Sequence, residues 1–130
     1  MSETQPNDKA GLPARAAALD LLTAALGGRA GMDEGLSHPA LAALDGRDRA
    51  FARALVMATL RHLGPIDSAL QSKVKKAPPD KVVQVLRLGV AQAFLLKTPV
   101  YAAVGASVDL VAQDKGLQMF KGLVLSLIHI

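Results

Sequence analysis

The residues of this chain whose types could do chemistry are mainly its cations. Arginine forms paired hydrogen bonds with phosphate oxygens, and lysine attracts phosphate as a point charge. A protein that neutralises several phosphates releases their counterions and so gains affinity for nucleic acid. We therefore predict an RNA-binding site made of eight cations: Arg15, Arg47, Arg49, Arg53, Arg61, Lys73, Lys75 and Lys76.

The same arginines have a structural alternative. Most cations are solvated or salt-bridged, and clustering on one face, which binding requires, is not visible in a sequence. Arg49 and Arg53 stand one helical turn apart, where like charges repel unless an acid or an anion lies nearby. Their partners in this alternative are Asp20, Asp45 or Asp109, and the pair would then organise the fold and contact no RNA.

Other classes of site lack their residues. The chain has no Cys, which excludes disulfides, thiolate metal sites and cysteine nucleophiles. His38, His62 and His129 lie far apart and in no metal-binding spacing, so we predict no metal ligand. Glycine-rich phosphate motifs and the GxSxG motif are absent. We assign no catalytic residue and no cofactor-binding residue.

Aromatic residues are too few to predict a base-stacking surface. Trp is absent and there is one Tyr, so we expect RNA binding to rest on phosphate and shape contacts. The net charge of +4 agrees with an anionic partner but is a weak signal alone.

Length and composition predict one all-α domain. A chain of 130 residues with 51% apolar content can bury one core but is short for two domains. Aromatics make up only 3%, and Ala and Leu dominate, which favours helices packed through small aliphatic side chains.

No segment predicts export or membrane insertion. Residues 1–12 are polar and carry no apolar stretch of the kind found in signal peptides. The longest apolar run, residues 82–96, contains Gln84, Arg87 and Gln92 and is shorter than the roughly 20 apolar residues of a membrane span. We expect a cytoplasmic protein without a membrane partner.

Residues 45–61 predict the helix around which the others are arranged. Asp45 suits the N-cap, and Asp48 lies three positions later, where a capping-box partner reaches back. At about 100° per residue, apolar residues nearly surround this helix, so we predict that it lies in the middle of a bundle. One face carries Phe51, Ala54, Leu55, Ala58 and His62, and the other side carries Val56 and Leu60.

Further helices are expected on both sides of this one. A first helix is predicted from Pro13 to Gly27, and a helical turn or two between loops in residues 29–43. Gly64 and Pro65 should end the long helix. After it we predict a short helix over residues 66–74, an exposed lysine corner, a buried helix over 81–96 capped by Asp80, a helix from Thr98 to Gly116, and helical structure over 117–130.

The order and spacing of several short motifs resemble a known family. The chain resembles the NusB-like helical domain, and most closely the version at the N-terminus of RsmB-type (Sun/Fmu) ribosomal RNA cytosine-C5 methyltransferases. The motifs are Arg15 with Ala18-Leu19, Arg47-Asp48-Arg49-Ala50-Phe51, Leu60-Arg61, Ile66-Asp67, Leu86-Arg87-Leu88-Gly89 with Gln92, Pro99 with Ala102-Ala103-Val104, Val108-Asp109-Leu110, and Lys121-Gly122-Leu123-Val124.

The resemblance implies a compact all-helical bundle that binds RNA, here small-subunit ribosomal RNA. In the methyltransferases, catalysis belongs to a separate C-terminal Rossmann-like domain that uses S-adenosylmethionine and a cysteine. This chain has no Cys, so it would supply the RNA-binding part alone, without a cofactor of its own. The alternative is a free-standing antitermination factor, which binds RNA together with a ribosomal protein.

The expected domain organisation follows from the same resemblance. Residues 1–12 form a flexible tail and residues 13–124 form the NusB-like domain. Residues 125–130 read Leu-Ser-Leu-Ile-His-Ile and depart from the family pattern. We expect them to be an anomalous tail produced by artefactual truncation of a longer gene, and we base no function on them.

Overall fold

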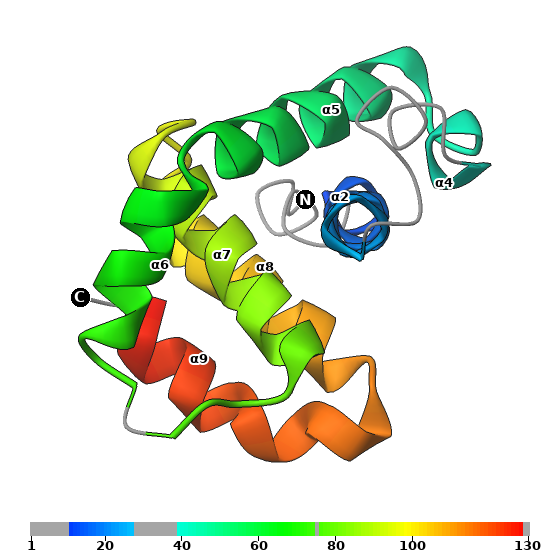
Figure 1. Ribbon diagram of the computed structural model, residues 1–130. Helices are drawn as coiled ribbons and strands as arrows, with labels where there is room; N and C mark the ends of the chain where they lie inside the picture. Colours follow the sequence, from blue (N-terminus) through cyan, green and yellow to red (C-terminus); the bar gives the residue numbers. More distant parts are fainter. Residues whose placement is uncertain (1–10, 28–38, 75, 129–130) are drawn as a thin grey trace.

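The regular structure of the described chain is helical throughout, which confirms the predicted all-α class. The computed structural model describes residues 11–27, 39–74 and 76–128 (Figure 1). The elements are α2 (Leu12–Leu26), α4 (Pro39–Ala42), α5 (Gly46–Arg61), α6 (Leu63–Gln71), α7 (Asp80–Phe94), α8 (Val100–Ala112), the 3₁₀ helix η1 (Lys115–Phe120) and α9 (Lys121–Ile128).

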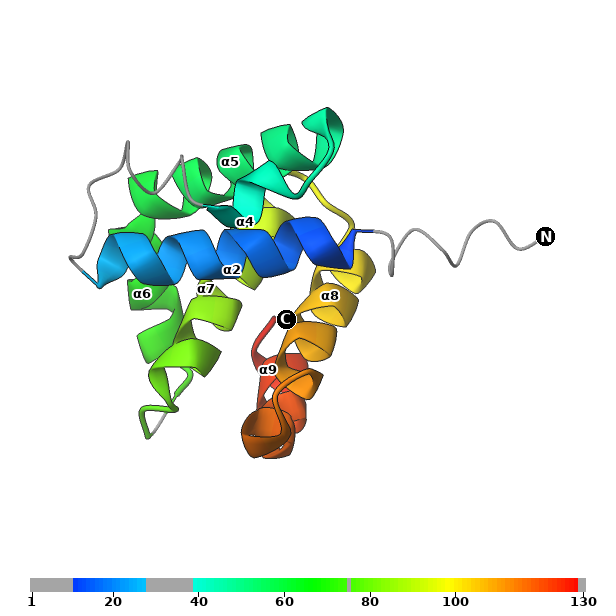
Figure 2. The ribbon, with the colours of Figure 1, turned by 90° about the vertical axis from the view of Figure 1, so that its right-hand side faces the viewer.

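The helices form two groups that are joined by α7 and by direct contact between α2 and α8. One group is the pair α2 and α5, and the other consists of α8, η1 and α9. Figure 2 shows α2 running across the molecule, with α5 above it and α7 and α8 crossing below. Helix α7 packs against α2 and α5 on one side, α8 and α9 on the other, and also against α6. None of the helices in the described ranges is long and apolar enough to cross a membrane.

Helix α2 forms where the first helix was predicted. Its buried face consists of three alanines and three leucines, and the short alanine side chains let its backbone approach its neighbours closely. The helix ends at Gly27, whose N–H donates to the carbonyl of Thr23. It begins at Leu12, and that side chain packs against the core. Leu12 therefore belongs to the domain and not to the tail in which we had placed it.

Helix α5 starts as predicted but is buried differently. The carboxylate of Asp45 accepts a hydrogen bond of 2.8 Å from the N–H of Asp48. The prediction of a helix in the middle of the bundle is wrong, because one face of α5 lies in solvent. The buried residues are Ala52, Leu55, Val56 and Thr59, whereas Ala54 and His62, assigned to the buried face, are exposed. Alanine counts as apolar in a pattern, but its small side chain loses little by facing water.

Helix α6 follows α5 almost without a break. Gly64 and Pro65 lie in its first turn, where proline is tolerated because the first N–H groups have no helical partner. They therefore start α6 and do not end α5. Ile66 and Leu70 are buried as their spacing predicted, and Val74 packs against the core just beyond the helix.

Helix α7 is the most buried element, as its apolar run predicted. Its buried residues are Val82, Gln84, Val85, Leu86, Leu88, Gly89, Ala91 and Gln92. The prediction that Asp80 caps it is wrong: Pro79 occupies the N-cap with extended backbone angles, and no side chain caps the helix. Asp80 is instead the first helical residue, where its carboxylate still faces the positive end of the helix dipole.

The C-terminal elements are shorter than predicted. Helix α8 follows Pro99 as expected but ends at Ala112, because Asp114 turns extended and its carboxylate accepts from the N–H of Gly116 at the start of η1. Helix α9 buries Val124 in the core and continues through residues 125–128. The anomalous origin of residues 125–130 stays a prediction, and residues 129–130 lie outside the described ranges.

Replacing the N-cap of α5 tests how much its start contributes to stability. Asp45→Ala leaves the N–H of Asp48 without its acceptor, so we expect a loss of about 1 kcal/mol in the free energy of unfolding. Urea denaturation followed by helical circular dichroism measures it. Asp45→Asn is the matched control, because asparagine caps about as well as aspartate. Equal stability of the two variants would contradict the capping role.

Candidate nucleic-acid interface

The solvent face of α5 carries a row of three exposed arginines, Arg47, Arg53 and Arg61. At about 100° per residue they fall within roughly 120° of the helix circumference, opposite the buried stripe. The helix rises about 1.5 Å per residue, so the row is about 21 Å long. We call these three residues the α5 arginine row. The structure thus brings together three of the eight predicted site residues.

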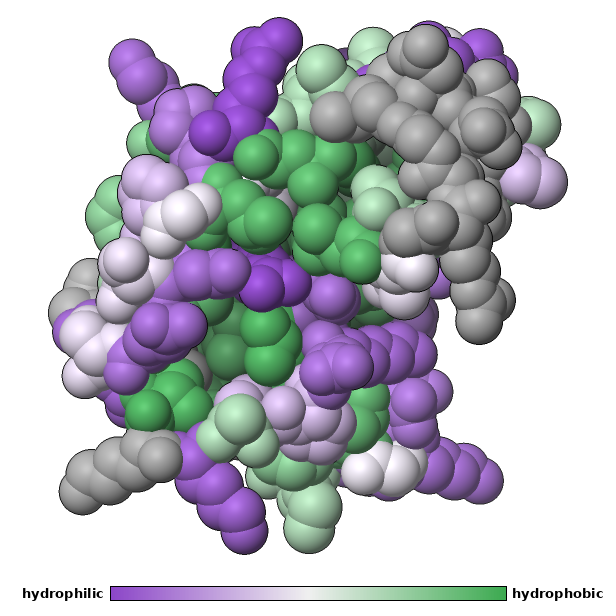
Figure 3. Space-filling view, in the orientation of Figure 1, coloured by the Kyte–Doolittle hydropathy of each residue, from purple (hydrophilic) through white to green (hydrophobic). Residues whose placement is uncertain are grey.

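Little on α5 interferes with access to this row. Ala50 and Ala54, which lie between the arginines, are exposed and short, so the guanidinium groups stand above the helix surface. The only carboxylate within α5 is Asp48, in the first turn. In Figure 3 hydrophilic side chains project from the upper edge of the molecule, where Figure 1 places α5. The row is therefore a positively charged edge open to a large anionic partner.

Arg49 does not belong to this row. Its Nε donates to the carbonyl of Leu41 at 3.1 Å and its Nη2 to the carbonyl of Leu44 at 2.7 Å. These bonds satisfy carbonyl groups at the end of α4 and fix that short helix to α5. Arg49 thus has the structural role of the alternative interpretation, but its partners are backbone carbonyls and not aspartates. Within the described ranges, neither Arg49 nor Arg53 forms an ion pair with the proposed aspartates.

Arg15 also makes contacts that hold the fold together. Its Nε donates to Oε1 of Gln92 at 2.5 Å, and its Nη1 donates to the carbonyl of Gly11 at 3.2 Å. Its guanidinium carbon lies 4.8 Å from the centre of the Phe51 ring, within the range of a cation–π contact. Arg15 therefore joins α2, α5 and α7. Sequence reasoning missed this role of Gln92, although a polar residue inside the longest apolar run was a signal for it.

The lysine corner is exposed as predicted, as far as it is described. Lys73 and Lys76 are exposed after α6, and Lys75 lies outside the described residues. A groove of about 250 Å³ between α6 and α7 lies beside it, lined by Val74 and Ala77 among others. The corner adds positive charge to the molecule, but nothing in the structure joins it to the α5 arginine row.

The wall of that groove contains a cation that the sequence did not single out as a site residue. Arg87 forms a paired contact with Asp67, Nε to Oδ1 at 2.7 Å and Nη2 to Oδ2 at 2.8 Å. Its Nη1 donates to Oε1 of Gln84 at 2.9 Å. All three nitrogen atoms of the guanidinium thus have protein acceptors, and the pair ties α6 to α7. Arg87 is accordingly a structural cation.

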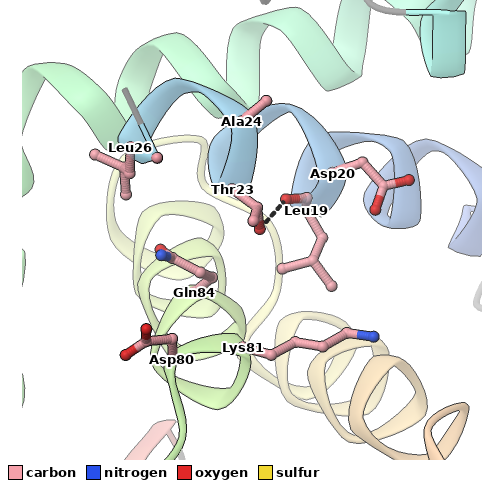
Figure 4. Close-up of a pocket in the computed structure, with 9 residues that line it drawn as sticks. Leu19, Asp20, Thr23, Ala24, Leu26, Asp80, Lys81 and Gln84 are labelled. Atoms are coloured by element: carbon pink, nitrogen blue, oxygen red, sulfur yellow. Dashed lines mark hydrogen bonds between the residues drawn. The ribbon is translucent and has the colours of Figure 1, made fainter. Parts of the chain in front are cut away.

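A larger pocket lies where the end of α2 faces the start of α7 (Figure 4), with a volume of about 750 Å³. Its charged groups are Asp20, Asp80 and Lys81. The hydroxyl of Thr23 donates to the carbonyl of Leu19 and so is already used. Two carboxylates against one ammonium make the pocket unfavourable for phosphate. The α5 arginine row is therefore a better candidate for a nucleic-acid interface than this pocket.

Among the residues that the structure describes, no three His, Asp or Glu side chains are grouped so as to hold a metal ion. His62 lies at the exposed end of α5, where its Nδ1 is 3.1 Å from the carbonyl oxygen of Ala58. It is therefore exposed, although we had placed it on an otherwise apolar face of a central helix.

Comparison with known proteins gives one match. The model of the NusB family matches residues 12–124, which is most of the chain and includes every helix from α2 to the start of α9. Neither the comparison with curated proteins nor the comparison with solved structures finds a match.

Truncation of two arginines one helical turn apart should change the stability of the protein to different extents. Arg49→Ala leaves the carbonyls of Leu41 and Leu44 without their donor, so we expect a loss of about 1 to 2 kcal/mol in the free energy of unfolding. Arg53→Ala removes an exposed side chain and should change that free energy by less than about 0.5 kcal/mol. Urea denaturation of both variants measures the contrast, and a destabilised Arg53→Ala would place Arg53 in the fold and not on the binding surface.

Proposed function

Because this chain belongs to the NusB family, whose members generally bind RNA, we propose that it binds the sugar-phosphate backbone of RNA through the α5 arginine row. The observation that carries the proposal is the exposure of Arg47, Arg53 and Arg61 on one face, with short alanines between them. Contacts of this kind position a protein on RNA without reading its sequence.

The distribution of arginine partners supports this choice of surface. Three other arginines donate hydrogen bonds within the protein. Arg15 donates to Gln92, Arg49 to carbonyls of the α4 segment, and Arg87 to Asp67. The members of the row are exposed to solvent, and among the described residues no acceptor binds their guanidinium groups. Lys73 and Lys76 are exposed as well and are candidates for additional phosphate contacts, with Lys75 between them in the sequence.

At a finer level, we propose that the domain is the RNA-binding part of a ribosomal RNA cytosine-C5 methyltransferase. The sequence Arg47-Asp48-Arg49-Ala50-Phe51 followed by Leu60-Arg61 supports this branch of the family. The RNA is then small-subunit ribosomal RNA in the cytoplasm. In this proposal S-adenosylmethionine and the catalytic cysteine belong to a separate Rossmann-like domain, as the resemblance implies, and the lack of Cys in this chain agrees with it.

The gene sequence tests the proposal that this domain belongs to a methyltransferase. We expect the genomic DNA downstream of the codon for Val124 to continue in frame into a Rossmann-like domain that contains cysteine. Sequencing that region is the measurement. A stop codon shortly after the domain would instead favour the free-standing antitermination factor, which binds RNA with a ribosomal protein.

A salt titration tests RNA binding by the arginine row. Affinity for a fragment of small-subunit ribosomal RNA should fall steeply with salt, since each phosphate contact contributes about 0.7 to the slope of log affinity against log salt. In the variant Arg47→Ala/Arg53→Ala/Arg61→Ala, three contacts are lost, so we expect the slope to become shallower by about 2. Fluorescence anisotropy of a labelled RNA gives both slopes.

The matched control keeps the charge. The variant Arg47→Lys/Arg53→Lys/Arg61→Lys should retain most of the slope, because lysine still neutralises phosphate although it lacks the paired geometry. Helical circular dichroism must show that both variants are folded, as the exposure of the row predicts. An unchanged slope in the folded alanine variant would remove the α5 arginine row from the interface.

A further inference from the structure

Two aromatic side chains stand in solvent at one corner of the molecule. The chain has three Phe and one Tyr. Phe51 and Phe120 pack against the core, whereas Phe94 is 66% exposed and Tyr101 is 77% exposed. Phe94 is the last residue of α7 and Tyr101 the second residue of α8, so both flank the short connection over residues 95–99. We call the segment 94–101 the α7–α8 corner.

The charge of this corner is positive. Lys97 lies at the middle of the connection, is exposed, and has a left-handed backbone with φ of 57°. Residues 81–108 contain three cations, Lys81, Arg87 and Lys97, and no acid. Lys81 pairs with Asp114 and Arg87 with Asp67, while Lys97 has no ion-pair partner among the described residues. The corner therefore offers one uncompensated ammonium group between two exposed rings.

Rings beside an ammonium group suit unpaired nucleobases. A base stacks on the flat face of an aromatic side chain, and a nearby cation neutralises the phosphate of the same nucleotide. A protein partner fits less well. Specific protein interfaces bury about 800 Å² on each partner, and beyond the two rings the corner adds only Val100 as a large exposed apolar side chain.

The corner also lies where an RNA held by α5 can reach it. In both Figure 1 and Figure 2 the connection between α7 and α8 lies in the part of the molecule nearer to α5 and away from α9. One strand that follows the outer surface can therefore meet both the α5 arginine row and the corner.

We propose that the α7–α8 corner is a base-stacking site, at which unpaired bases of RNA stack on Tyr101 and Phe94 while Lys97 neutralises a neighbouring phosphate. This inference rests on the proposed RNA-binding function and adds to it a preference for single-stranded segments. It differs from our expectation that the chain lacks a stacking surface. That expectation counted aromatic residues, whereas stacking depends on whether their faces are accessible.

The fluorescence of the protein reports on this site directly. Since Tyr101 is the only Tyr and the chain has no Trp, tyrosine emission comes from this one side chain. We expect a short oligouridylate, whose bases are largely unstacked, to quench the emission in proportion to the bound fraction measured by anisotropy. An abasic strand of the same length carries the phosphates without the bases, and it should bind without quenching.

Variants separate stacking from charge. Tyr101→Ala and Phe94→Ala should each weaken binding of oligouridylate about tenfold and leave binding of the abasic strand unchanged. Tyr101→Phe keeps the ring and should bind oligouridylate like the parent. Val100→Ala is the matched control, because it removes exposed apolar area beside Tyr101 without removing a ring. All three positions are exposed, so circular dichroism should show that the four variants are folded.

The outcomes distinguish this inference from the proposed function. If oligouridylate and the abasic strand bind equally well, with no quenching and no effect of Tyr101→Ala, the stacking site is wrong while RNA binding by the α5 arginine row stands. The same result would favour a protein as the partner of the α7–α8 corner. If neither strand binds even at low salt, the proposed function and the stacking site are both overturned.

Discussion

The buried amide of Gln92 is the constraint on which the arrangement of the helices depends. Its side chain is fully buried within α7, where an amide without partners would cost about 1 to 3 kcal/mol. Its Nε2 donates to the carbonyl of Leu88, and its Oε1 accepts from Arg15 of α2. Arg15 in turn lies over the ring of Phe51 in α5. Gln92 and Arg15 together thus link α7, α2 and α5, with the buried residues of α5 turned toward the core and its arginine row turned outward.

That orientation divides the arginines into two kinds by their surroundings. Where a guanidinium can reach protein acceptors it joins elements: Arg49 holds α4 to α5, and Arg87 holds α6 to α7. The outward arginines of α5 are exposed, and no acceptor in the described part of the chain binds them. The same residue type therefore stabilises the fold at some positions and carries the proposed function at others. Membership of the NusB family fits both uses, since the motif residues include members of each kind.

The two proposed RNA contacts differ in what they recognise. The α5 arginine row neutralises phosphates, which single-stranded and double-stranded RNA both present. The α7–α8 corner offers ring faces, which only unpaired bases can use. Together they describe a surface that binds RNA tightly through charge and prefers segments with unpaired bases through stacking. The pocket between α2 and α7 is not part of this proposed surface, because its mixed charge is unfavourable for phosphate.

The sequence by itself determined the fold class, most helix positions and the start of α5. These features depend on local signals, namely helix propensity, the N-cap Asp45, and Gly and Pro at helix ends, which act over a few neighbouring residues. It did not determine which face of α5 is buried, since alanine suits both environments. It also did not determine which arginines donate hydrogen bonds to other groups of the described chain. Those depend on Leu41, Leu44 and Gln92, and only the tertiary structure brings these residues to the arginines. The exposure of Tyr101 was decided in the same way, because burial is a property of packing and not of composition.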